Sequence, residues 1–192
     1  MTPIRVLYVG GTGRTGSTLL ERVLGSMPGV VSLGEMTWFW YAMRAGGRCS
    51  CGLTYDRCPL WSAALDEAYG EVGIDPSEMY RLRMRHDSRH LPLLAIPGAS
   101  DRLMRRLGPY PERLVDLYRA VREVSGASVL VDSSKEPHYS HILASRPEFD
   151  VRVVHLVRHP VAVAWSWSRV RVEHGFGGAH TMETRGPLSA SV

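Results

Sequence analysis

The stretch that decides the fold is RVLYVGGTGRTGST, residues 5–18. It opens with an apolar, β-favouring run over residues 5–9 that ends at two glycines, and apolar positions at helical spacing follow over residues 17–24. A buried strand, a tight glycine turn and a helix are therefore predicted. The backbone N–H groups of such a turn, with the positive end of the helix dipole, favour a phosphate or sulfate group.

Further β-favouring runs lie at residues 30–33, 129–131 and 151–157, and the last two lead through a polar turn into a helical pattern. Residues 37–126 are mostly helical in pattern. We predict an α/β fold: a three-layer, P-loop-like parallel sheet flanked by helices, with a helical insertion (about 37–126) between the second and third strands. One domain over residues 1–174 and an irregular tail over residues 175–192 are expected.

Composition excludes several classes of protein. With 192 residues, 44% of them hydrophobic and 22% charged, the chain is the size and type of one globular domain, not a disordered tail, coiled coil or collagen-like fibre. Its apolar runs are far shorter than the ~20 residues of a membrane helix. The start lacks a signal-peptide layout, so we expect a cytoplasmic protein. A net charge of +4 does not by itself indicate a nucleic-acid partner.

The glycine loop fits two kinds of nucleotide site. Residues 11–16 satisfy G-x-G-x-x-G, and Glu35 follows about 20 residues on, as in a Rossmann site for NAD(P). The same residues satisfy G-x-x-x-x-G followed by Ser17 and Thr18, a P-loop without its usual Lys. The missing Lys and the absence of an obvious Mg²⁺ ligand argue against nucleotide triphosphate hydrolysis. Arg14 could supply the cation instead, because a planar guanidinium suits a sulfonate or phosphate.

A second anion site is predicted where the strand at 151–157 ends. Arg158 leaves this strand, and Ser166 lies eight positions later on the following helix, so a guanidinium and a hydroxyl could hold one anion. Lys135 follows the strand at 129–131 and is the single Lys of the chain, in which every other basic residue is Arg. We expect it to deliver a compact ammonium to a crowded site.

With both sites in view, the chain resembles the sulfotransferases that use 3′-phosphoadenylyl sulfate (PAPS), in their bacterial, tyrosylprotein-sulfotransferase-like branch. In that family a loop of the form R/K-[ST]-G-[ST]-[ST] holds the 5′-phosphosulfate, and a later Arg and Ser hold the 3′-phosphate. The resemblance implies in-line transfer of a sulfonate to an acceptor hydroxyl, with PAPS as cosubstrate and no metal. The donor-binding residues that it implies are Gly13, Arg14, Thr15, Gly16, Ser17, Thr18, Arg158 and Ser166.

The resemblance also implies three catalytic residues. Glu35, in a Gly-Glu segment, matches the general base that takes the proton of the acceptor hydroxyl. Lys135 matches a Lys that reaches the transferring sulfonate, and Arg14 shares the neutralisation of its charge. The acceptor is expected to be a small molecule or a peptide; lipid, sugar, peptide tyrosine and secondary metabolite all remain open. An NAD(P)-binding oxidoreductase and a non-catalytic nucleotide-binding fragment remain the alternatives.

Two further groups have simpler interpretations. Cys49, Cys51 and Cys58 lack a well-spaced fourth ligand and so make a poor zinc site, which favours free thiols or one local disulfide. The aromatic residues 38–41 are expected in helix packing, with an acceptor wall as the alternative. His155, inside a predicted strand, is expected in the core.

The resemblance covers residues 4–172, whereas members of the family are usually longer and continue into a late Gly/Arg-rich loop that closes over the 3′-phosphate. We expect either a truncated or frameshifted product or a second copy, as a homodimer, that completes the site. Donor binding is then expected to be weaker than in longer members, with little or no turnover.

Overall fold

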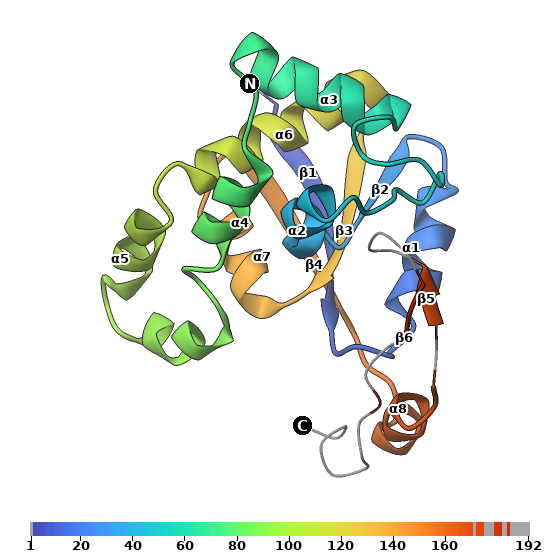
Figure 1. Cartoon of the computed structure of the whole chain (residues 1–192). Helices are drawn as coiled ribbons and strands as arrows, with labels where there is room; N and C mark the ends of the chain where they lie inside the picture. The colour runs from blue at the N-terminus through green and yellow to red at the C-terminus, as the bar shows by residue number, and fades with distance from the viewer. Residues whose placement is uncertain (1, 171, 175–178, 182–183, 185–192) are drawn as a thin grey trace.

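The computed structural model describes residues 2–170, 172–174, 179–181 and Thr184, and its centre is a four-stranded parallel sheet (Figure 1). The strand order is β2-β3-β1-β4. The strands are β1 (Ile4–Gly11), β2 (Val30–Gly34), β3 (Val129–Lys135) and β4 (Phe149–Leu156).

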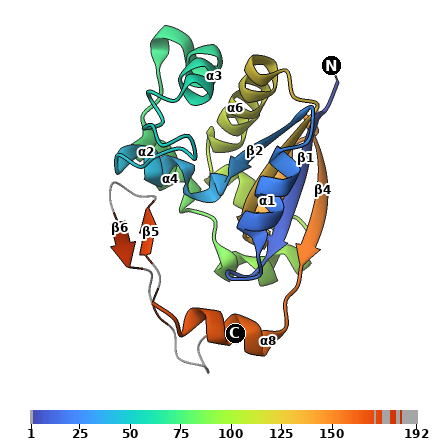
Figure 2. The same cartoon turned by 90° about the vertical axis from the view of Figure 1, so that its right-hand side faces the viewer.

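Helices cover both faces of this sheet. Helix α1 (Ser17–Gly25) connects β1 to β2, whereas α6 (Tyr110–Ser125) leads back to β3 and α7 (Pro137–Ala144) leads from β3 to β4. Because parallel crossovers are right-handed and these connections run in opposite directions across the sheet, α1 lies on one face and α6 and α7 on the other (Figures 1 and 2). The predicted α/β fold with helices flanking a parallel sheet is confirmed.

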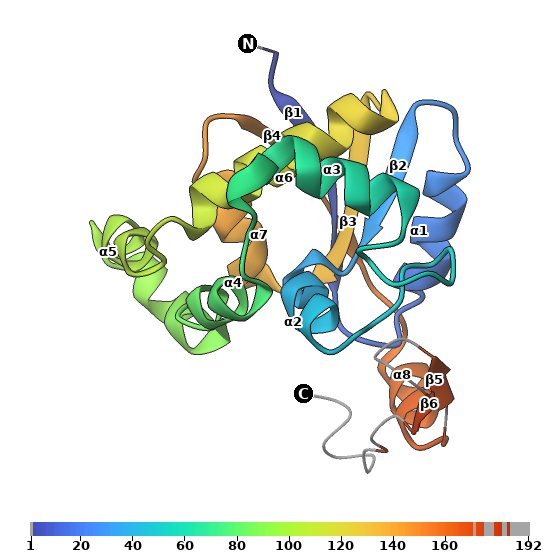
Figure 3. The ribbon, with the colours of Figure 1, turned by 45° about the horizontal axis from the view of Figure 1, so that its top comes forward.

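The segment between β2 and β3 is helical, as predicted. It contains η1 (Met36–Trp38), α2 (Phe39–Arg44), α3 (Pro59–Tyr69), η2 (Gly70–Val72), α4 (Pro76–Arg83), η3 (Ser88–Ala95), α5 (Ala99–Arg106) and α6. Helix α6 buries Leu114, Leu117, Tyr118 and Val121, a helical spacing that forms one apolar stripe. Helix α3 packs along α6 on the outside (Figure 3).

The topology creates a crevice at the carboxyl ends of the strands. The chain leaves β1 for the face of α1, but it leaves the neighbouring strand β3 for the opposite face, where α7 lies. Loops that diverge in this way leave room between them, and ligands of open α/β sheets bind there. The loops after β1, β3 and β4 therefore meet at one edge of the sheet.

Strand β3 is longer than its apolar run. A polar turn was expected from Asp132 onward, but the strand continues to Lys135. The Asp132 carboxylate is buried and accepts hydrogen bonds from the Tyr118 hydroxyl (2.6 Å) and the Ser134 backbone N–H (2.9 Å). These hydrogen bonds compensate for the burial of the Asp132 carboxylate, so strand β3 can continue past this residue. Burial raises the pKa of Asp132 to about 6.

Strand β4 is one of the two edge strands of the four-stranded sheet, and its side chains are exposed near its carboxyl end. The side chain of His155 is exposed and that of Val153 is 60% exposed, so the expectation of a core position for His155 is wrong. Successive residues of a strand point to opposite faces, and residues 152–155 are all exposed, so in the described part of the chain neither face of the sheet is covered at this end of β4. Helix α8 (Pro160–Trp167) follows, beyond the carboxyl end of the sheet (Figure 2).

Part of the predicted irregular tail is a strand. Residues Ala179–Thr181 form β6, which pairs antiparallel with β5 (Val172–His174). The rest of that tail, apart from Thr184, lies outside the described residues. No helix in the described ranges has the length and apolar character needed to cross a bilayer.

Candidate functional site

The glycine loop after β1 is shaped around Trp167 of α8. The guanidinium of Arg14 lies over the Trp167 ring, 4.8 Å from its centroid. A Cβ atom on Gly13 would lie only 2.8 Å from Cζ2 of the same ring. Position 13 therefore has to be glycine for Trp167 to approach the loop, and the cation–π contact ties Arg14 to α8.

The loop presents anion-binding groups at the start of α1. The first N–H groups of a helix have no acceptor within the helix and point outward with the positive end of its dipole. The Ser17 and Thr18 side chains stand at this position. Thr15 behaves differently, because its hydroxyl donates to the Thr12 carbonyl oxygen (2.8 Å) and so closes the loop.

Arg158 joins the two predicted anion sites. Its Nη1 atom donates to the backbone carbonyl oxygen of Arg14 at 3.0 Å. This contact is possible because β1 and β4 are neighbours, with Gly11 paired to Leu156 in register. Ser166, on α8, is buried. The two sites, far apart in the sequence, thus lie against each other.

Glu35 and Lys135 also meet. Glu35 follows β2, Lys135 ends β3, and the two adjacent strands bring the carboxylate and the ammonium into an ion pair. The Lys135 side chain is 15% exposed and that of Glu35 is 41% exposed, so the pair lies at the surface of the crevice. The ammonium also donates to the Ser133 carbonyl oxygen (3.2 Å).

Backbone strain is concentrated at two of the predicted catalytic residues. Among the described residues, Arg14 (φ 70°) and Lys135 (φ 68°) are the non-glycine residues with positive φ. This conformation costs an L-residue about 1–2 kcal/mol. Strain of this kind gathers at functional sites, where the surrounding structure holds it in place.

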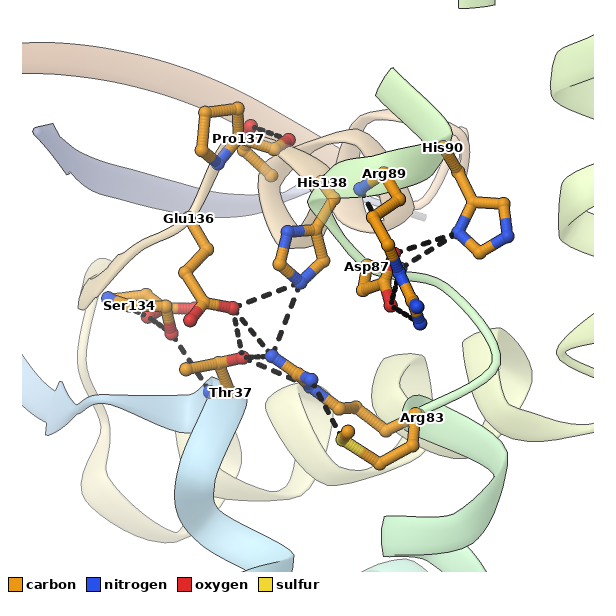
Figure 4. A network of polar contacts seen from close by, with 12 residues as sticks. Thr37, Arg83, Asp87, Arg89, His90, Ser134, Glu136, Pro137 and His138 are labelled. Atoms are coloured by element: carbon orange, nitrogen blue, oxygen red, sulfur yellow. Dashed lines mark hydrogen bonds and ion pairs between the residues drawn. The ribbon is translucent and has the colours of Figure 1, made fainter. Parts of the chain in front are cut away.

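A buried polar network holds the segments that carry the Glu35–Lys135 pair (Figure 4). The Glu136 carboxylate accepts from Arg83 (2.5 Å), His138 (2.9 Å) and the Thr37 hydroxyl (3.1 Å). Burial alone would raise the pKa of Glu136, but the His138 hydrogen bond and the Arg83 charge hold it below its usual value. Because Thr37 lies two residues after Glu35 and Glu136 follows Lys135, the network fixes both segments together.

Glu21 of α1 makes a second connection of this kind. Its two carboxylate oxygens accept hydrogen bonds from the hydroxyls of Ser32 on β2 and Ser133 on β3. The helix that begins at the glycine loop is thereby fixed to the two strands that carry the ion pair. Sequence reasoning identified neither Glu21 nor Arg83, because a single acid or Arg on a helix carries no local signal of its partners.

One cavity of about 920 Å³ collects nearly all the predicted residues. Thr15 is the exception. The predicted residues that line the cavity are Gly13, Arg14, Gly16, Ser17, Thr18, Glu35, Lys135, Arg158 and Ser166. Its charged side chains are thus mainly cationic, with one carboxylate beside them, an arrangement suited to a polyanion and to a proton transfer.

Aromatic side chains form another part of the cavity wall: Trp38, Tyr41, Tyr55 and Tyr80. Tyr41 and Tyr80 have ring centroids 5.4 Å apart, and the Arg44 guanidinium lies near both rings. The aromatic residues 38–41 therefore fall into two groups, one in the core and one at the cavity. Phe39 and Trp40 are buried in the core, whereas Trp38 and Tyr41 face the cavity.

Comparisons with known proteins show the family of the chain. The model of the Sulfotransferase family matches residues 7–184. A solved structure, the sulfotransferase STF1 from Mycobacterium tuberculosis H37Rv, is similar at 22% sequence identity and a TM-score of 0.38, over 87% of this chain and 48% of that chain. The present chain thus spans about half the length of that structure. No curated protein matches the chain. Because the family model covers most of the residues, as the resemblance predicted, the chain belongs to the sulfotransferase family.

Proposed function

We propose that this chain transfers a sulfonate from PAPS to the hydroxyl of a small-molecule or peptide acceptor by in-line displacement. The observation that carries the proposal is the hydrogen bond from Arg158 to the Arg14 carbonyl, which joins the predicted 5′ and 3′ anion sites in one cavity. A nucleotide with anionic groups on both sides of its ribose needs such a double site.

The charged groups of the cavity fit PAPS as the sulfonate donor. Arg14, Lys135 and Arg158 bring three cationic groups to one cavity, beside the N-terminus of α1. PAPS supplies a sulfonate already attached to a good leaving group, the 5′-phosphate. We assign the 5′ end to the N–H groups and side chains of residues 13–18, and the 3′-phosphate to Arg158 and Ser166.

Catalysis then depends on positioning and fixed charge. Arg14 and Lys135 would neutralise the charge on the sulfonate and on the departing phosphate oxygen. Glu35 would accept the proton of the acceptor hydroxyl as the new oxygen–sulfur bond forms and the sulfur–phosphate oxygen bond breaks. The ion pair between Lys135 and Glu35 supports these two roles. If the Lys135 ammonium is attracted to the sulfonate, the Glu35 carboxylate is released and becomes available to the acceptor hydroxyl.

The aromatic wall indicates the body of the acceptor. Trp38, Tyr41, Tyr55 and Tyr80 offer flat apolar surfaces with polar edges in the same cavity as Glu35. An acceptor with an aromatic or other apolar body and a free hydroxyl fits this wall best.

Calorimetric titration tests the proposal. Adenosine 3′,5′-bisphosphate, the product that PAPS leaves, is titrated into the chain in parallel with NADP and adenosine 5′-phosphate. We expect the bisphosphate to bind at least about tenfold more tightly than either, a difference of about 1.4 kcal/mol. Tight NADP binding without bisphosphate binding would instead identify a dinucleotide site and reject the sulfotransferase function.

A further inference from the structure

The three cysteines converge on one point. Cys49 and Cys51 lie in the loop after α2, Cys58 immediately precedes α3, and their sulfur atoms all lie within 4.8 Å of one another. Zinc bound tetrahedrally, at about 2.3 Å from each thiolate, holds the sulfurs about 3.8 Å apart. Small side-chain rotations would therefore bring all three sulfurs to bonding distance of one ion.

The backbone around the sulfurs is held in a tight loop. Arg48 and Thr54 form a β-bridge, and the Cys49 N–H donates to the Leu53 carbonyl (2.8 Å). Gly52, at φ 88°, makes the turn, and its N–H donates to the Cys49 carbonyl (2.9 Å). The Cys58 N–H donates to the Thr54 carbonyl (2.9 Å), which ties the third cysteine to the same loop. The convergence thus follows from backbone hydrogen bonds and not from side-chain placement alone.

The Arg48 guanidinium, bonded to the Gly52 carbonyl (2.8 Å), adds positive charge beside the loop. Three thiolates around a divalent cation carry one net negative charge, which this guanidinium would balance.

We propose that Cys49, Cys51 and Cys58 bind a zinc ion that fixes the segment 48–58. Thiolate ligands select zinc among the common divalent cations. Among the described residues no fourth His, Cys, Asp or Glu belongs to the group, and Cys51 is exposed, so a water molecule or another small ligand takes the fourth position. The sequence alone favoured free thiols or one disulfide. A disulfide would join only two of the sulfurs, whereas all three converge in the structure. This convergence is the reason for proposing a zinc site in place of free thiols or a disulfide.

The zinc site would support the wall of the cavity. Arg48 and Tyr55, which both line the cavity, lie within the segment that the three cysteines would clamp. Cys58 is buried beside the core, where Tyr55 packs against Phe39 with ring centroids 5.0 Å apart. The role is therefore structural: the ion holds the segment that presents these two side chains.

Metal analysis of the whole chain tests the proposal. After purification under reducing conditions and dialysis against trace zinc, mass spectrometry of the metal content is expected to give one zinc ion per chain. Replacement of zinc by Co²⁺ is expected to give the near-ultraviolet charge-transfer absorption of thiolate–cobalt bonds. Cys51→Ser, at the exposed ligand, is expected to bind zinc at least about 100-fold more weakly while the fold is kept. Ser77→Ala, at an exposed serine of α4, is the control and should bind zinc as the wild type does.

Three results would overturn the proposal. One is a reduced wild-type chain that takes up no stoichiometric zinc and shows no thiolate–cobalt absorption. Another is zinc binding that Cys51→Ser leaves unchanged, since the metal would then be held elsewhere. A disulfide between two of the cysteines in the purified protein, found by peptide mass mapping, would also replace the zinc site, because it removes two of its three ligands. None of these measurements involves the sulfonate donor, so they stand apart from the test of the proposed function.

Discussion

The ammonium of Lys135 and the carboxylate of Glu35 form an ion pair across the long helical segment that separates them in the sequence. The pair exists because β2 and β3 are adjacent and parallel, so the residues at their carboxyl ends meet. In the proposed reaction these are the group that meets the sulfonate and the group that takes the acceptor proton. Their contact lets one event, the arrival of an anionic donor, change the surroundings of both.

Glu35→Gln is expected to separate catalysis from donor binding. The amide keeps the size of the side chain but cannot take a proton at neutral pH, so transfer should fall by about 10²- to 10⁴-fold. Binding of adenosine 3′,5′-bisphosphate should be unchanged or tighter, because Lys135 loses its carboxylate partner. Initial rates with radiolabelled PAPS and calorimetry measure the two effects. Glu71→Gln, at an exposed acid outside the cavity, is the control, and full transfer by Glu35→Gln would contradict the role of a base.

The left-handed backbone at Lys135 predicts a difference between two substitutions that remove the same ammonium. Lys135→Ala keeps a Cβ in a conformation that disfavours it, whereas Lys135→Gly relieves that strain at the expense of a more flexible unfolded chain. The Gly variant should therefore be more stable than the Ala variant by about 0.5–1 kcal/mol, with equal loss of activity. Urea unfolding followed by circular dichroism measures the difference. Equal stability of the two variants would mean that position 135 is not left-handed in solution.

Arg158→Ala is expected to act on one phosphate of the nucleotide. Loss of a charged hydrogen bond of about 1.5–3 kcal/mol should weaken adenosine 3′,5′-bisphosphate by about 10- to 100-fold. Adenosine 5′-phosphate, which lacks the 3′ group, should lose little. Arg152→Ala, at an exposed Arg of β4, serves as the control in the same titrations. If both nucleotides lose affinity equally, Arg158 acts through its hydrogen bond to the Arg14 carbonyl and does not meet the 3′-phosphate.

The parts of the site that sequence could predict are those encoded locally. The strand, glycine loop and helix at residues 4–25 are contiguous, and Arg158 and Lys135 each follow a β-favouring run. Parallel strands place their carboxyl ends together whatever the order of the sheet, so residues chosen by this rule were expected to meet. In the structure they line one cavity.

What sequence could not predict depends on packing between distant elements. Arg83 pairs with Glu136 because α4 packs near the start of α7, and nothing in an Arg-rich stretch distinguishes this Arg from its neighbours. Asp132 extends β3 because Tyr118, on α6, satisfies it. The exposure of His155 follows from the lack of cover on the faces of β4 in the described part of the chain, which the apolar pattern of its own residues does not reveal.

His86 gives the fold a predicted sensitivity to acid. The side chain is fully buried, and neither ring nitrogen has a hydrogen-bond partner among the described residues. The rings of His90, His138 and His141 have centroids within 5.6–5.9 Å of the His86 ring. Burial, and then the charges of these three neighbours, lower the pKa of His86 to about 4, with Asp87 opposing the shift.

The sign of the effect follows from linkage. Folding lowers the pKa of His86, so its neutral ring makes its full contribution to stability at pH values above the unfolded pKa, about 6.5. That contribution is lost as the pH falls toward 4. The expected loss of unfolding free energy over this interval is about 3 kcal/mol. His86→Phe keeps an aromatic ring and removes the protonation site together with two unpaired nitrogens. Its unfolding free energy should be higher at neutral pH and fall less steeply in acid. Urea titrations at several pH values between 4 and 7 measure the slope for the wild type, for His86→Phe and for the exposed control His155→Gln. A wild-type slope that His86→Phe leaves unchanged would assign the acid sensitivity to other groups.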